Sequence, residues 1–160
     1  MKNKILILCI YVLFHSCEPD DICLDAIDDT PKILIGFYDK DSKTKKEVNN
    51  LMIQGIDNDE IYLIQTLDSV AIPLKNLENL SSYNFVKDYT ENENNSGNND
   101  KLFINYDFTY KYISRACGYI TNYELKNLVI ENDNNNWILE TEIIITNIID
   151  EENIHVKIFH

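Results

Sequence analysis

The chain has 160 residues, a formal net charge of −13 and a sequence pI near 4.5. This length is enough for one domain with a substantial core. The acidic surface would repel a phosphate backbone, so we expect no nucleic-acid partner, and solubility is the ordinary reason for such a charge. The sequence lacks a phosphate-binding loop, a dinucleotide-binding glycine pattern and a nucleophile-elbow serine, so we expect no cofactor and name no catalytic residue.

The N-terminus has the three parts of a secretory signal. Two lysines within the first four residues precede an apolar run at 5–14, and the small residue Ser16 stands before Cys17. The run has about ten residues, whereas a helix that spans a bilayer needs roughly 20. We therefore expect residues 1–16 to be an export signal. The alternative, a buried helix of a cytosolic protein, leaves the basic start unexplained.

Cys17 is the expected site of a lipid anchor. A thiolate is the nucleophile that accepts a diacylglycerol group in bacterial lipoproteins, and residues 13–17 resemble a loose lipobox. Ser16 fits that motif, whereas Phe14 and His15 depart from its strict form. Two or three acyl chains hold a protein stably on a membrane, at about 0.8 kcal/mol per buried methylene. The sequence thus predicts a lipid-anchored envelope protein.

An acidic leader at residues 17–31 follows the signal. It contains six Asp or Glu residues and two prolines, which favour an extended tether. Three of the acids, Glu18, Asp20 and Asp21, come directly after the lipidated cysteine and resemble the surface-export signal of Bacteroidota lipoproteins. We therefore expect the outer membrane, with the cell surface favoured over the periplasm. A plain spacer is the alternative reading of the leader.

Two cysteines remain when Cys9 leaves with the signal and Cys17 takes lipid. An exported chain matures where disulfides persist, so we expect a bridge between Cys23 and Cys117. A bridge that closes a loop of about 95 residues stabilises by up to about 4–5 kcal/mol in the chain-entropy model. The alternative is a reactive thiol at Cys117, although no activating base lies near it in the sequence.

Beyond Pro31 the apolar residues recur mostly with the period of two that is typical of strands. Expected strands lie, in chain order, at residues 33–38, 48–56, 61–65, 70–74, 83–87, 101–112 and 154–158. The clearest is 101–112, whose even-numbered side chains we expect to face the core: Leu102, Ile104, Tyr106, Phe108, Tyr110 and Tyr112.

The segment 137–149 is ambiguous. Its isoleucines would line one face of a helix, but six Ile and two Thr in thirteen residues favour a strand, which residues 150–153 would turn back into the last strand as a hairpin. Polar loops are expected at 92–100 and 132–136. We expect a single all-β domain, residues 32–160, that forms an antiparallel β-sandwich of the immunoglobulin-like or transthyretin-like kind. A small β-barrel and an α+β fold with one C-terminal helix are the alternatives.

Three residues are candidates for binding. Arg115 lies in the segment 114–119 directly after the longest strand and would hold a carboxylate with two hydrogen bonds. Gly118 in the same segment permits a turn with positive φ. Tyr119 and His155 complete the set. A disulfide-pinned corner with a solvated arginine is the simpler interpretation of this segment, and we favour it.

We expect no metal site. Residues 57–60 and Asp133 supply oxygen ligands, but neither has the glycine and closing glutamate of a calcium loop, so ordinary acidic turns are favoured. His155 and His160 are five residues apart, and on one strand this spacing places them on opposite faces.

Several segments together carry a family resemblance, and in chain order they are 21–24 (DICL), 31–39 (PKILIGFYD), 68–74 (DSVAIPL), 114–119 (SRACGY), 137–138 (WI) and 155–160 (HVKIFH). Their order and spacing resemble an uncharacterised family of small Bacteroidota lipoproteins over nearly the whole chain after the signal. The resemblance implies an envelope location and a fold class but no activity. Such lipoproteins tend to be encoded beside outer-membrane barrel proteins, so it also implies a partner of that kind.

Two functions remain open from the sequence. The first is a binding or accessory module of the envelope, which an exposed aromatic patch would favour. The second is an envelope enzyme with a loop-assembled site around Arg115 and His155, which a deep pocket with perturbed acids and a histidine would favour.

The lipid anchor gives the first testable prediction. Metabolic labelling with a clickable fatty acid is expected to tag the wild-type chain and not the Cys17→Ser variant, because the thiol that accepts the lipid is gone. Equal labelling of the two chains would contradict acylation at this residue.

Overall fold

The computed structural model describes residue 23, residues 29–91 and residues 96–160. The expected signal, Cys17 and most of the acidic leader lie outside these residues. Ten strands are present: β1 (Ile33–Tyr38), β2 (Val48–Gly55), β3 (Ile61–Leu67), β4 (Ser69–Ile72), β5 (Leu80–Thr90), β6 (Ser96–Ser114), β7 (Gly118–Ile130), β8 (Glu140–Ile143), β9 (Asn147–Ile148) and β10 (Val156–Phe159).

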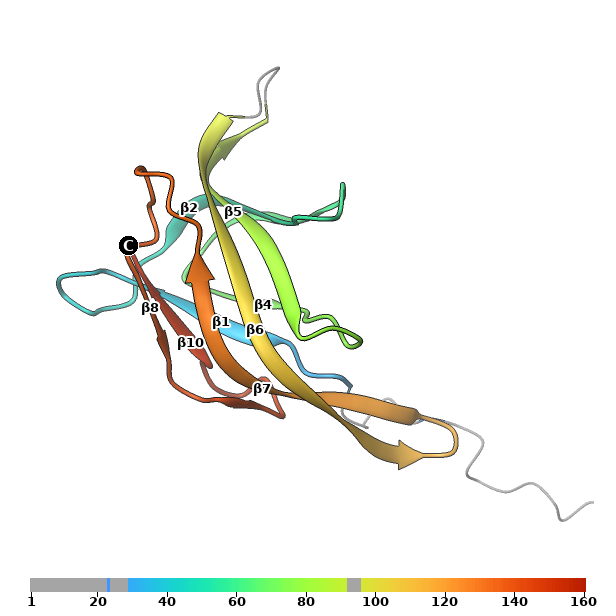
Figure 1. Cartoon of the computed structure of the whole chain (residues 1–160). Coiled ribbons are helices and arrows are strands. Elements are labelled where there is room, and N and C mark those ends of the chain that lie inside the picture. Colours follow the sequence, from blue (N-terminus) through green and yellow to red (C-terminus); the bar gives the residue numbers. More distant parts are fainter. Residues whose placement is uncertain (1–22, 24–28, 92–95) are drawn as a thin grey trace, which may run out of the picture.

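The strands form two sheets that pack against each other (Figure 1). The smaller sheet has the order β4-β1-β10-β8 and the larger one the order β3-β2-β5-β6-β7-β9. Neighbouring strands are antiparallel except β1 and β10, which pair in parallel with Ile35 opposite Val156. The all-β sandwich prediction is confirmed. The sequence analysis did not anticipate the parallel pair, which joins the first and last strands of the domain.

One hydrophobic core lies between the two sheets. Ile33, Ile35 and Phe37 of β1 are fully buried and belong to the same cluster as Leu102 and Ile104 of β6. Every second residue of β6 from Asp100 to Tyr106 is buried, as expected for a strand with one face on a core. Removal of this apolar surface from water is the main stabilising contribution to the fold.

The predicted core face of β6 is correct at one end and wrong at the other. Leu102, Ile104 and Tyr106 are at most 1% exposed and Phe108 is half-buried, but Tyr110 and Tyr112 are each 53% exposed. The reason is visible in Figure 1, where the β6–β7 hairpin continues past the body of the molecule. Among residues 29–91 and 96–160, no second sheet covers this end of the hairpin, so the alternating pattern persists there without a core.

Strand β7 was not anticipated from the sequence because a bulge interrupts its pattern. Asn105 pairs with Asn127, but the next residue of β6, Tyr106, pairs with Leu125, which leaves Lys126 as an extra residue. An extra residue moves all later side chains to the opposite face. The apolar positions of β7 therefore change phase halfway along the strand.

The ambiguous segment 137–149 is neither a helix nor a single strand. Trp137 and Ile138 are buried in a loop, β8 pairs with β10, and β9 crosses to the larger sheet and pairs with β7. The alternative with a C-terminal helix is therefore wrong, and no helix occurs in the described residues.

Polar groups of the larger sheet hold this loop in place. The Ile138 amide donates to the buried Asp100 carboxylate at 2.8 Å, and the Trp137 indole donates to the Phe85 carbonyl at 3.0 Å. Asp100 was expected in the polar loop 92–100, but β6 already begins at Ser96, so that expectation is wrong for residues 96–100.

The uneven burial of β6 predicts a graded series of truncations. Ile104→Ala is expected to lower the free energy of unfolding by about 2–5 kcal/mol, because it leaves a cavity in the core. Phe108→Ala is expected to cost less than the value of about 3–5 kcal/mol that is typical of a fully buried Phe. Tyr112→Ala, which lies beyond the body, is expected to change stability by no more than about 0.5 kcal/mol. Urea unfolding of the three variants gives the order, and an equal loss at positions 104 and 112 would contradict it.

Candidate functional site

Tyrosine hydroxyls from four different strands hold the end of β4 and the segment that follows it. We call the five tyrosines that do this the tyrosine clamp. Each donates its hydroxyl to a backbone carbonyl, and the acceptors are consecutive or nearly so. The pairs are Tyr62 to Ala71 (2.9 Å), Tyr83 to Pro73, Tyr123 to Leu74 (3.1 Å), Tyr106 to Lys75 (2.9 Å) and Tyr110 to Asn76 (3.0 Å). Residues 73–76 lie outside any strand, so their carbonyls lack ladder partners. The clamp supplies those partners and fixes the path of the segment.

Burial keeps the inner tyrosines of the clamp protonated. It raises the pKa of Tyr83 and of Tyr123 to about 12, and it also raises the pKa of Tyr106. These phenols therefore remain hydrogen-bond donors throughout the ordinary pH range.

Ser81 closes the contact between the segment and the larger sheet. Its hydroxyl accepts a hydrogen bond from the Lys75 amide at 2.9 Å and lies 2.7 Å from the Tyr106 hydroxyl. Ser81 is 1% exposed, and with the Tyr106 hydroxyl it satisfies both polar groups of the Lys75 backbone.

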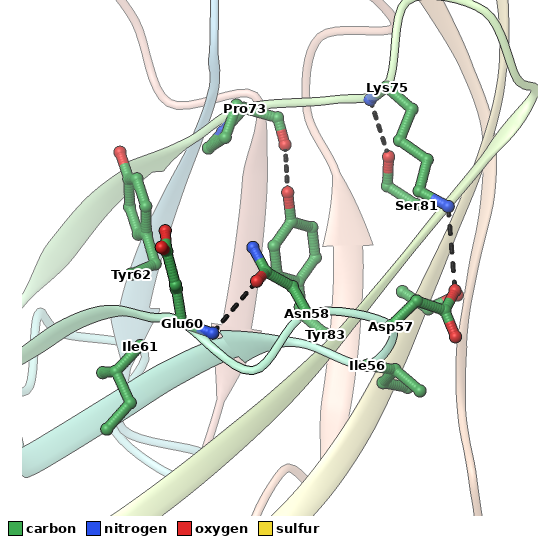
Figure 2. A pocket seen from close by; sticks show the side chains of 12 residues that line it. Ile56, Asp57, Asn58, Glu60, Ile61, Tyr62, Pro73, Lys75, Ser81 and Tyr83 are labelled. Atoms are coloured by element: carbon green, nitrogen blue, oxygen red, sulfur yellow. Dashed lines mark hydrogen bonds and ion pairs between the residues drawn. The ribbon is translucent and has the colours of Figure 1, made fainter.

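A pocket of about 360 Å³ opens between this segment and the turn that joins β2 to β3. Its size is within the range of small-molecule sites. Figure 2 shows the side chains of Asn58, Glu60, Tyr62 and Tyr83 pointing toward the segment that carries Pro73. The residues that line the pocket are Gly55, Ile56, Asp57, Asn58, Glu60, Ile61, Tyr62, Pro73, Lys75, Ser81, Ser82 and Tyr83.

Carboxylates outnumber cations at this pocket. Lys75 is the cation of the lining, and its ammonium lies 3.8 Å from Asp57 and 3.0 Å from Glu78. Glu60 adds another carboxylate to the wall. The negative balance disfavours an anionic ligand, while the phenol, amide and carboxylate groups suit a neutral or cationic molecule that donates hydrogen bonds.

Sequence reasoning did not identify this pocket. Residues 57–60 were weighed as oxygen ligands of a calcium loop, and an acidic turn was favoured; the structure shows such a turn, with the Glu60 amide donating to the Asn58 side chain at 3.0 Å. The other walls come from Lys75 and Tyr83, which are distant in the sequence and carry no motif. The pairing of β2 with β3 and β5 brings the turn and Tyr83 together, and the hydrogen bonds of the Lys75 backbone to Ser81 and Tyr106 add Lys75.

The disulfide expected from the sequence is confirmed. Cys23 and Cys117 are bonded, with their Cα atoms 4.9 Å apart, within the limit of about 7 Å for a bridge. Gly118, the next residue, has a φ of 73°, as the predicted turn requires. The bridge removes the reactive thiol that was the alternative for Cys117.

The three candidate binding residues lie in different surroundings. Arg115 and Tyr119 are exposed at the β6–β7 turn. The Tyr119 ring packs against the Tyr112 ring, with the two ring centroids 5.2 Å apart. His155 is 1% exposed, and its Nδ1 accepts a hydrogen bond from the Leu34 amide at 2.9 Å. His155 thus joins the start of β10 to β1.

Burial lowers the pKa of His155 despite the opposing charges of Asp150 and Glu151, and it also lowers the pKa of His160. Both histidines are therefore neutral at pH 7. In this state His155 can accept the Leu34 hydrogen bond, which is a structural role.

The part of the chain that the structure describes shows neither a metal-binding cluster nor a membrane-spanning helix. Its residues contain no group of three or more His, Cys, Asp or Glu side chains placed to hold a metal ion. They also form no helix with the length and apolar character needed to cross a bilayer.

The fold and site define a small disulfide-linked β-sandwich with an acidic pocket beside the tyrosine clamp. The chain matches a family of unknown function, DUF6452, over residues 50–160, and it belongs to this family. No curated protein and no solved structure is significantly similar to it.

The tyrosine clamp predicts a difference between two tyrosines of the same strand. Tyr106→Phe is expected to lower the free energy of unfolding by about 1–3 kcal/mol, because it leaves the Lys75 carbonyl without its buried donor. Tyr112→Phe is the matched control and is expected to stay within about 0.5 kcal/mol of wild type. Thermal unfolding of both variants tests this, and equal melting temperatures would contradict the role of the clamp.

Proposed function

We propose that the protein is a lipid-anchored binding or accessory module of the outer-membrane envelope. The observation that carries the binding role is the pocket beside the tyrosine clamp, because it combines the volume of a ligand site with convergent polar groups from three separate segments. The domain is on the cell-surface side in this proposal.

Export and anchoring are supported by the N-terminus and by the disulfide. The bridge between Cys23 and Cys117 needs an oxidising compartment in which to form and persist. The apolar run at 5–14 followed by Cys17 supplies a route to that compartment and an acceptor for lipid. The acids directly after Cys17 support the surface side.

The ligand in this proposal is a small neutral or cationic molecule with several hydrogen-bond donors, such as a neutral sugar or an amine. Glu60 and Asp57 are acceptors for such donors, and the partly exposed Tyr62 ring offers an apolar surface beside them. The partner that presents or receives the ligand is an outer-membrane barrel protein, as the resemblance of the sequence implies.

The pocket gives the fourth prediction. In saturation-transfer NMR with a panel of neutral sugars, amines and acidic sugars, the neutral or cationic compounds are expected to bind and the acidic ones are not. For a bound compound, Glu60→Ala is expected to weaken affinity roughly 10–100-fold, the equivalent of a lost hydrogen bond to a charged group.

Glu47→Ala is the matched control, because Glu47 is an exposed carboxylate outside the pocket lining. The Glu47→Ala variant is expected to bind the same compound with the affinity of the wild-type protein. Binding that is insensitive to Glu60, or a preference for acidic sugars, would contradict the assignment of the pocket.

A further inference from the structure

The disulfide places the expected lipid anchor close to the tip of the β6–β7 hairpin. Cys117 lies in the hairpin turn, and its partner Cys23 is six residues after Cys17. Six residues of extended chain span at most about 20 Å. Because the bridge is covalent and its Cα atoms are 4.9 Å apart, the backbone of Cys17 cannot move farther than about 25 Å from Cys117.

The first described residues after Cys23 lie beside the hairpin, on the side of the tip that faces the body of the domain. Thr30 lies beside β7, where its hydroxyl accepts a hydrogen bond from the Thr121 amide at 3.1 Å. The C-terminus lies at the opposite end of the molecule from the hairpin tip (Figure 1). The tip is therefore the end of the domain that faces the anchor.

The composition of the tip differs from that of the rest of this acidic chain. Residues 108–123 contain no Asp or Glu, although the whole chain has 27 acids, and they include Lys111 and Arg115. A hairpin tip that contributes no carboxylate of its own adds no acid at the edge of a membrane. The acids of the leader, among them Glu18, Asp20 and Asp21, offset the two cations, so attraction to anionic lipid is not the main contribution.

Aromatic side chains occupy the same end. Tyr112 and Tyr119 are opposite each other across the hairpin and are 53% and 67% exposed. Their rings contact each other, and among the described residues their hydroxyls have no hydrogen-bond partner, unlike those of the clamp. Tyrosine is enriched at membrane interfaces, where the ring meets apolar chains and the hydroxyl meets water or headgroups.

We propose that the tip of the β6–β7 hairpin is a membrane-contact surface, in which Tyr112 and Tyr119 lie in the interface of the bilayer that holds the lipid anchor. The inference rests on the proposed acylation of Cys17. The tether raises the local concentration of the tip at the bilayer, so a weak contact by two tyrosines is enough to orient the domain. The hairpin then stands on the membrane, with the C-terminal end of the sandwich away from it.

The experiment uses the full acylated chain, with its acyl mass verified, in phosphatidylcholine vesicles whose upper acyl chains carry bromine. Tyr119→Trp reports contact of the tip with lipid through quenching of its fluorescence. Val129→Trp is the matched control, because Val129 is 49% exposed on the same strand, ten residues or about 33 Å farther along. The single natural Trp137 is common to both variants.

Quenching of the added tryptophan is expected to be at least threefold stronger at position 119 than at 129, and nearly unchanged by added salt or anionic lipid. Equal quenching at the two positions in acylated protein would overturn the membrane contact and leave the anchored module intact. A chain that carries no acyl mass at Cys17 would overturn the anchor itself, and the contact with it.

Discussion

The arrangement of the domain depends on hydrogen bonds between tyrosine hydroxyls and the backbone that follows β4. This segment must leave the smaller sheet and enter β5 of the larger sheet, and its carbonyls lose their ladder partners on the way. Tyr83, Tyr106 and Tyr123 bury their rings in the core and give their hydroxyls to three successive carbonyls. The same residues thus join the two sheets by apolar contact and by hydrogen bonding. They also fix the segment after β4, which forms one wall of the pocket.

The sequence predicted what alternation and covalent chemistry determine. The strands at 33–38 and 101–112 have clear patterns because one face of each meets the core, and the Cys23–Cys117 bridge followed from the number of cysteines left after export. The sequence did not predict β7, where the extra residue Lys126 reverses the phase of the pattern.

Contacts between segments that are distant in the sequence could not be predicted from it either. Nothing local indicates that β10 pairs in parallel with β1, or that Glu60, Lys75 and Tyr83 meet at one pocket. These depend on the sheet order, which a single sequence does not encode in any short motif.

The tyrosines of β6 show how one residue type acquires different roles along a single strand. Tyr106 is buried and bonds to Lys75, Tyr110 is half-exposed but still reaches the Asn76 carbonyl, and Tyr112 lies beyond the segment altogether. Alternation alone places all three on one face. Their roles differ because the body of the domain ends before the strand does, and the Tyr112 ring, which lies past the last carbonyl of the clamp, packs against Tyr119 instead. The bridge at Cys117 holds Cys23 at that end of the hairpin, and a lipid on Cys17, as proposed above, would bring a bilayer to the same end.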